Sequence, residues 1–251
     1  MQNKEIYDRI LQDERWLGWM AAIDKHAEEI TREEYLYDHS EGHAHAVADR
    51  AMDFIWKLRM SDEEVWLAGI AGLLHDIGNA VNRDDHEKES ARMLEEDGRN
   101  FLRSVGMKDE GSMDRLIYAV SAHSSGNEIN DVLDAAVVLA DKIDQRKSRM
   151  LVSEEAAMEY FDEMDRAGRG YSEAIKTMFI NVMKVNDVSI EIWDDRLVVK
   201  YAVDEGFGMG LFHAWPKAVR VPFRVAQFLG KGFELSINGV TVPEEEYREL
   251  L

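Results

Sequence analysis

Apolar residues recur at three- and four-residue spacing through most of the first 150 positions of the chain. This spacing puts the apolar side chains on one face of a helix, so it predicts a series of amphipathic helices. Short polar breaks separate them, and several breaks end in Asp, Ser or Asn, which are common helix N-caps. Loops this short favour an antiparallel bundle. The predicted helices cover residues 6–22, 44–58, 62–74, 87–94, 113–122 and 132–143.

The pattern changes after residue 150, and from residue 187 the apolar period becomes two, which is typical of half-buried strands. Two such runs flank Asp194 and Asp195, so they predict a β-hairpin. The predicted elements of this part are helices at 152–167, 171–184 and 216–229 and strands at 188–193, 196–203 and 233–240.

The predicted fold class is therefore mainly α, a helical bundle with a small C-terminal α+β module. We expect three parts along the chain. Residues 1–150 form the helical domain together with an N-terminal helical extension, residues 151–186 form a helical connector, and residues 187–251 form the α+β module.

Charge and composition narrow the range of partners. The 251 residues include 50 acidic and 30 Lys or Arg side chains, for a formal net charge of −20. A field of this sign repels phosphate backbones and anionic lipid, so we expect no nucleic-acid polymer and no membrane as partner. A local basic patch is still compatible with a small phosphorylated substrate, and a homodimer remains open. Without cysteine, thiolate metal sites and disulfides are excluded. No signal-peptide pattern or long apolar run is present, so we expect a cytoplasmic protein.

Histidine and aspartate recur through the helical part in an order that suits a metal site. His75 and Asp76 follow an apolar helix, and Asp141 lies inside the apolar stretch AAVVLADKID (135–144), where a carboxylate is costly to bury unless it is paired or bound to metal. Alone, the His-Asp pair could equally be a helix-terminal His beside a solvated Asp. Imidazole and carboxylate together suit Fe, Mn, Co, Ni or Zn. The other histidines of this series are His43, His86 and His123.

The order H…HD…H…H…D resembles the HD-domain superfamily of metal-dependent phosphohydrolases. The segments that carry the resemblance are GHAHAVADRA (42–51), LLHDIGN (73–79), HEKESA (86–91), IYAVSAH (117–123) and VLADKID (138–144). The resemblance implies an HD-domain helical bundle that binds two divalent transition metal ions, with Asp76 bridging them. The implied ligands are His43, His75, Asp76 and Asp141 for one ion and Asp76, His86 and His123 for the other.

Four further histidines are assigned by position. Family spacing selects His43 rather than His45 as the first ligand, and the two point to different sides of a helix. His39 is either a substrate contact or a loop histidine. We expect structural roles for His26 and His213.

A basic cluster follows Asp141. Lys142, Arg146 and Arg149 would share one helix face, and they either bind substrate phosphate or form a solvated surface. The cluster, LLHDIGN and the dipeptide Asn82-Arg83 also resemble a little-characterised HDIGN branch of the superfamily. Many members carry a cation at the position of Asn79. Arg83 either replaces that cation as a phosphate contact or is a solvated loop arginine.

The function predicted from this resemblance is hydrolysis of a small phosphate ester, such as a nucleotide or dinucleotide-like compound, by metal-activated water at a binuclear site. Asp76, Lys142 and Arg146 are the predicted catalytic residues, and Arg83, Lys142, Arg146 and Arg149 the predicted substrate contacts. Two alternatives stay open. One is an HD-type diiron oxygenase with the same ligands, and the other is a regulatory binding module that the metals stabilise.

Overall fold

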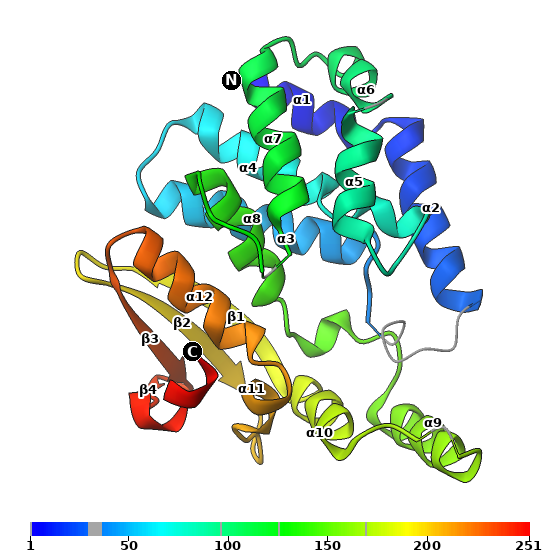
Figure 1. Cartoon of the computed structure of the whole chain (residues 1–251), viewed down its shortest axis with the longest axis vertical. Helices are drawn as coiled ribbons and strands as arrows, with labels where there is room; N and C mark the ends of the chain where they lie inside the picture. The colour runs from blue at the N-terminus through cyan, green and yellow to red at the C-terminus, as the bar shows by residue number, and fades with distance from the viewer. Residues whose placement is uncertain (1, 30–36, 96, 125, 169) are drawn as a thin grey trace. The chain divides into compact units, whose positions relative to one another are not determined.

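The computed structural model describes the whole chain except residues 1, 30–36, 96, 125 and 169 (Figure 1). The described residues form two compact units. The first contains residues 2–29 and Asp38–Asp141, and the second contains Tyr37 and Lys142–Leu251. None of the described helices is both long and apolar enough to cross a membrane. The division into 1–150, 151–186 and 187–251 stays a prediction.

The first unit is helical, as the apolar period predicts. Its helices are α1 (Gln2–Ile10), α2 (Glu14–Glu29), α3 (Glu41–Lys57), α4 (Asp62–Leu74), η2 (Ile77–Ala80), α5 (His86–Glu95), α6 (Gly98–Ser104), α7 (Glu110–Ala122) and α8 (Val132–Lys142), whose last residue starts the second unit. Apolar side chains such as Val47, Phe54, Ile70 and Leu116 fill its core and are fully buried. The mainly α fold class is confirmed.

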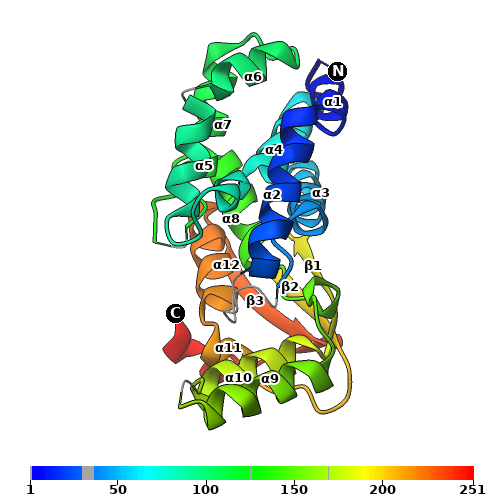
Figure 2. The same cartoon turned by 90° about the vertical axis from the view of Figure 1, so that its right-hand side faces the viewer.

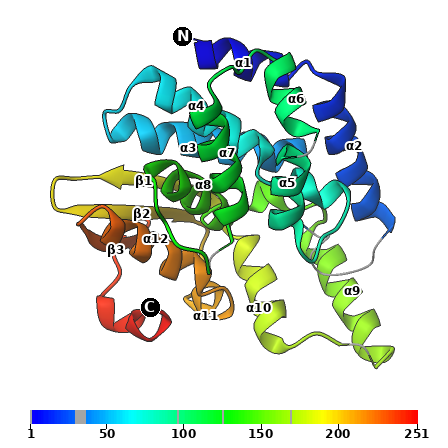
Figure 3. The same ribbon diagram turned by 45° about the horizontal axis from the view of Figure 1, so that its top comes forward.

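Helices α3 and α4 lie side by side in this unit (Figure 3). Gly72 allows their close approach, because a Cβ atom there would lie 2.5 Å from the Cα atom of Ala48. Real Cβ atoms do not approach backbone this closely, so any side chain at position 72 would push the two helices apart. The spacing of α3 and α4 therefore depends on this glycine.

Two local predictions were wrong in the first unit. The single helix predicted over 6–22 is split into α1 and α2 (Figure 2). Asp13 explains the break, because its Oδ1 accepts a hydrogen bond from the backbone N–H of Arg15 at 2.9 Å and so begins a new helix. Helix α6 was not predicted. It has seven residues, of which only Phe101 and Leu102 bury large apolar side chains. This segment is too short for a helical apolar period to be recognised.

The second unit combines helices with a four-stranded sheet. Its elements are η3 (Lys147–Arg149), α9 (Glu154–Arg166), α10 (Glu173–Val182), β1 (Val185–Ile192), β2 (Arg196–Val203), α11 (Gly210–Ala214), α12 (Lys217–Phe228), β3 (Gly232–Ile237), β4 (Val240–Thr241), η4 (Glu244–Glu246) and η5 (Arg248–Leu250). The strand order is β1-β2-β3-β4. The hairpin β1–β2 is antiparallel as predicted, whereas β3 runs parallel to β2 after a crossover through α11 and α12. Helix α12 packs on β2 and β3 (Figure 1).

The strand predicted over 233–240 is interrupted by a tight turn. Asn238 and Gly239 have φ values of +49° and +79°, and the chain reverses there into β4. Asn and Gly tolerate positive φ best, and an Asn-Gly pair is the usual sequence of a two-residue hairpin turn. The side chain of Asn238 also exchanges two hydrogen bonds with the backbone of Val203, at 2.8 and 3.0 Å, which ties this turn to the end of β2.

Candidate metal centre

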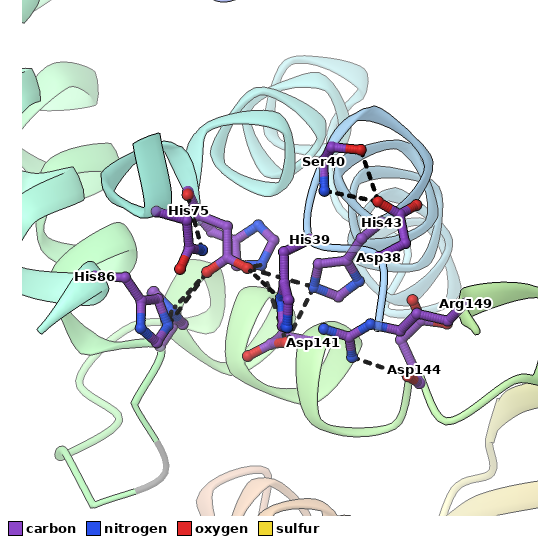
Figure 4. Close-up of polar contacts among 12 residues, drawn as sticks. Asp38, His39, Ser40, His43, His75, His86, Asp141, Asp144 and Arg149 are labelled. Atoms are coloured by element: carbon purple, nitrogen blue, oxygen red, sulfur yellow. Dashed lines mark hydrogen bonds and ion pairs between the residues drawn. The ribbon is translucent and has the colours of Figure 1, made fainter. Parts of the chain in front are cut away.

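The six residues predicted as metal ligands lie at or beside helix ends of the first unit, and the structure brings all six together (Figure 4). All but His86 are buried. They are His43 in the first turn of α3, His75 and Asp76 directly after α4, His86 at the start of α5, His123 directly after α7, and Asp141 one residue before the end of α8.

Hydrogen bonds within the local backbone fix the direction of three of the imidazole rings. Nδ1 of His75 lies 2.8 Å from the carbonyl oxygen of Gly72, and the corresponding contacts are 2.6 Å for His123 and 3.0 Å for His86. A carbonyl only accepts, so each Nδ1 carries the proton and donates it. Each Nε2 atom then has a free lone pair, which is the form in which histidine binds a metal ion.

One group of ligands gathers around Oδ2 of Asp76. Nε2 of His75 lies 3.5 Å from this oxygen, and Nε2 of His43 lies 3.7 Å from it. Oδ1 of Asp141 completes the group, at 3.4 Å from His43 Nε2 and 3.9 Å from His75 Nε2. The Nε2 atom of His75 is buried without a hydrogen-bond partner. An orphaned acceptor that faces two carboxylates fits a bound cation.

A second group gathers around the other oxygen of the same carboxylate. Oδ1 of Asp76 lies 3.3 Å from Nε2 of His86 and 3.5 Å from Nε2 of His123. These separations suit ligand atoms that each lie about 2.1 Å from a shared ion. Asp76 thus presents one oxygen to each group, which is the arrangement that a bridging carboxylate requires.

The charge states of the cluster also suit metal binding. Burial lowers the pKa of His75 to about 3 and lowers that of His86 as well, so both imidazoles are neutral near pH 7. Burial acts to raise the pKa of the Asp76 carboxyl, but the surrounding imidazoles hold it well below its usual range. The cluster therefore offers neutral nitrogen and anionic oxygen donors, a set that fits Fe, Mn, Co, Ni or Zn.

Gly78 explains how His86 comes close to Asp76. A Cβ atom at position 78 would overlap the carbonyl oxygen of His86 and lie 2.5 Å from the backbone nitrogen of Ser90. The N–H of Gly78 also donates to Oγ of Ser90 at 2.8 Å. This contact holds η2 against the first turns of α5, so the glycine after the His-Asp pair sets the position of the second ligand group.

Arg83, a predicted substrate contact, lies beside the cluster. Its Nη1 donates to Oδ1 of Asn79 at 2.7 Å, and its Nη2 lies 3.0 Å from Nε2 of His39. Nδ1 of His39 lies 3.4 Å from Oδ2 of Asp76, so the structure places this histidine at the site rather than in a loop away from it. No sequence spacing connects His39 with Arg83, which is why the pattern alone left its role open.

The remaining histidines lie outside the cluster. His45 is partly exposed, stacks edge-on against Trp16 and lies 3.6 Å from Glu41, which agrees with the choice of His43 as the buried candidate. His26 approaches the backbone oxygen of Asn79 with its Nδ1 at 3.2 Å. His213 belongs to the second unit, where it lies 3.7 Å from Glu249.

The interpretation of the basic cluster as one helix face was wrong. Helix α8 ends at Lys142, and Arg146 has extended backbone, so these residues do not have helical i, i+4 spacing. Nε of Arg146 pairs with Oδ1 of Asp144 at 2.8 Å. Arg149 is buried, donates to the carbonyl oxygen of Asp144 at 3.1 Å and lies over the ring of Tyr37. The substrate roles of Lys142, Arg146 and Arg149 stay predictions.

Comparison with known proteins agrees with this geometry. Residues 36–146 match the HD domain family. All six clustered residues fall within this segment. The HD domain is generally a metal-dependent hydrolase domain, and the His and Asp groups described here are suited to that chemistry.

Two curated relatives, both named Ribonuclease Y, share part of the sequence. The protein from Desulfotalea psychrophila is 39% identical over 80 residues, which are 32% of this chain and 13% of the relative. The protein from Rubrobacter xylanophilus is 30% identical over 144 residues, which are 56% of this chain and 26% of the relative. The chain thus spans at most about a quarter of the length of these two proteins.

Proposed function

We propose that this chain is a metal-dependent phosphohydrolase with a binuclear site, since residues 36–146 match the HD domain family and contain all six clustered residues. The observation that carries the proposal is the division of the Asp76 carboxylate between two ligand groups. One oxygen faces His43 and His75, and the other faces His86 and His123. A site for one ion would need only the first group.

Two divalent ions held by these residues would supply Lewis acidity, which lowers the pKa of a water molecule toward neutrality and offsets charge on phosphate oxygens. The chain's own residues have separate tasks. Asp76 and Asp141 supply the anionic oxygens, and the neutral imidazoles hold them at fixed separations. The surrounding apolar helices α4 and α8 keep bulk water away from the carboxylates, which strengthens every electrostatic contact there.

Four cationic side chains are the proposed contacts for substrate phosphate. The guanidinium of Arg83 contacts Asn79 and His39, so its direction is fixed before a ligand binds. Lys142 follows the ligand Asp141 directly in the chain, and we retain it with Arg146 as a proposed contact that offsets transition-state charge. Arg149 remains a predicted contact, and its bond to the carbonyl oxygen of Asp144 makes it the least accessible of the four.

The proposed substrate is a small phosphate ester, such as a nucleotide or a dinucleotide-like compound. The net charge of −20 disfavours a long polyanion. The similarity to two proteins named Ribonuclease Y favours RNA as a second candidate substrate, since one of these relatives is 30% identical to the chain over 144 residues. The two candidates differ in size, in charge and in the cleaved bond, because RNA is a phosphodiester whereas phosphate release from a nucleotide cleaves a monoester or an anhydride.

The test is metal analysis of anaerobically purified protein, combined with phosphate-release and RNA-cleavage assays at matched metal concentration. About two metal ions per chain and release of phosphate from nucleotides or dinucleotides would support the proposal. Cleavage of single-stranded RNA without turnover of the small esters would identify RNA, rather than a small ester, as the substrate. Two irons with oxygen consumption and no hydrolysis would favour the diiron oxygenase, and metal without any turnover would favour the regulatory module.

A further inference from the structure

Arg83 determines which nitrogen of His39 carries a proton. A guanidinium group can donate hydrogen bonds but cannot accept them. Since Nη2 of Arg83 lies 3.0 Å from Nε2 of His39, this Nε2 must be the acceptor. The proton of the neutral imidazole is then on Nδ1, which faces Oδ2 of Asp76 at 3.4 Å. His39 is thus a hydrogen-bond donor to the carboxylate that the two ligand groups share.

The contacts around Asp76 close into a ring. Nδ2 of Asn79 donates to the backbone oxygen of Asp76 at 3.0 Å, and Nη1 of Arg83 donates to Oδ1 of Asn79 at 2.7 Å. Arg83 then donates to His39, which returns to the side chain of Asp76. The ring joins the backbone of Asp76 to its own carboxylate and therefore limits rotation of that carboxylate.

The backbone on both sides of His39 is also held in place. Asp38 accepts hydrogen bonds from the backbone N–H and the hydroxyl of Ser40, at 2.8 and 2.7 Å, and Ser40 is the N-cap of α3 (Figure 4). The side chain of His39 is only 11% exposed. The imidazole is therefore fixed by its backbone, by burial and by Arg83 together.

His39 could instead be a metal ligand, because its ring nitrogen lies close enough to His43 and Asp76 to share an ion with them. Coordination through Nδ1 would require the proton to move to Nε2. That proton would then point at the guanidinium of Arg83, so that two donors would face each other. The contact with Arg83 thus favours a donor role for His39 over a ligand role.

We propose that Asn79, Arg83 and His39 form a positioning ring that holds the Asp76 carboxylate in its bridging orientation, with His39 as a hydrogen-bond donor and not a metal ligand. This inference rests on the proposed binuclear site. Loss of the ring would let the carboxylate rotate, which moves both oxygens, so the Asp76 carboxylate would no longer face both groups at once and the affinity for the second ion would fall.

The experiment is a titration of the metal-free full chain with Mn²⁺, followed by electron paramagnetic resonance, which distinguishes an exchange-coupled pair from isolated ions. His39→Asn keeps an N–H donor near the position of Nδ1, whereas His39→Phe removes it. His39→Asn keeps the donor to Asp76 but loses the acceptor for Arg83, so we expect it to bind two Mn²⁺ with a coupled signal, with the second ion weakened no more than in Arg83→Met. His39→Phe should weaken the second Mn²⁺ by about 10–100-fold, the usual range for a lost partner of a ligand.

Arg83→Met tests the tautomer, because it frees His39 to turn or to carry its proton on Nε2. We expect weaker binding of the second Mn²⁺ here too, with a smaller effect than for His39→Phe. Matched controls are His45→Phe, on the outer side of α3, and Arg92→Met, whose partner is Glu89 on the surface of α5. Both controls should bind two Mn²⁺ as the wild type does, and circular dichroism checks that each variant is folded.

Each other outcome overturns the inference in a recognisable way. If His39→Asn loses an ion as completely as His39→Phe, His39 is a ligand. If His39→Phe binds a coupled Mn²⁺ pair as tightly as the wild type, the ring does not position Asp76. If the wild type binds fewer than two Mn²⁺, the proposed binuclear function itself is wrong. The titration of the wild type shows this before any variant is compared.

Discussion

Each unit buries an aspartate side chain, and the groups around these two aspartates are arranged differently. In the second unit, Asp144 is buried but is paired with Arg146, and Arg149 donates to its backbone oxygen. In the first unit, Nε2 of His75 is buried without a hydrogen-bond partner and faces the oxygens of Asp76. Buried groups that satisfy one another stabilise a fold, whereas buried acceptors that face other acceptors need a cation. This difference is the reason to propose a bound cation in the first unit and none at Asp144.

Removing the charge of Asp76 should have the largest effect. Asp76→Asn keeps the shape of the side chain but takes one anionic oxygen from each ligand group. We expect metal content to fall from about two ions per chain to below one, and hydrolysis to fall by at least about a thousandfold if both ions are needed. Metal analysis and phosphate release measure this. Full metal occupancy in this variant would contradict the bridging role.

Replacement of Arg149 in the second unit should lower the free energy of unfolding and leave the metal content unchanged. Arg149→Met removes a buried guanidinium that bonds to the carbonyl oxygen of Asp144 and lies over Tyr37. Breaking a buried charged contact of this kind costs about 2–4 kcal/mol. Denaturant unfolding should show the loss, while metal content stays at the wild-type value. Loss of metal together with normal stability would instead assign Arg149 to the site.

Gly78→Ala should have an intermediate effect confined to one ligand group. The added Cβ would overlap the backbone at His86 and Ser90, so α5 must move away from η2. Overpacking of this type costs about 1–3 kcal/mol. Since His86 moves with α5, the ion at the group of His86 and His123 should bind more weakly than the other. A Mn²⁺ titration that shows two unchanged ions would mean that α5 adjusts without displacing its histidine.

The sequence predicted the ligand cluster better than its surroundings, for physical reasons. His75 and Asp76 could be found because a polar pair after an apolar helix is unusual. The ordered series of further histidines makes it less plausible that this pair arose by chance. The contact of His39 with Arg83 joins residues 44 positions apart, and no periodicity records it. Arg146 was misjudged because the helical period was extended past Lys142, where α8 ends and the chain becomes extended.

The same reasoning applies to turns and helix ends. The predicted mainly α class follows from many residues in each helix, so single errors do not change it. A break such as the one at Asp13 depends on one side chain that bonds to the backbone of Arg15, and a continuous apolar period conceals it. The turn at Asn238 and Gly239 had a sequence signal, but the β-like residues on both sides outweighed it in the prediction.

The smallest expected effect comes from a glycine that lacks the close contacts of Gly78. In the middle of α2, Gly18 is exposed, and a Cβ atom there would meet nothing within 4 Å. Gly18→Ala should therefore stabilise the chain by about 0.5–1 kcal/mol, because alanine loses less backbone entropy in a helix. Denaturant unfolding measures the gain, and Mn²⁺ titration should give wild-type affinities. If Gly18→Ala also weakened the ion at His86, general sensitivity of the helical unit, rather than the contact of Gly78 with α5, would explain both variants.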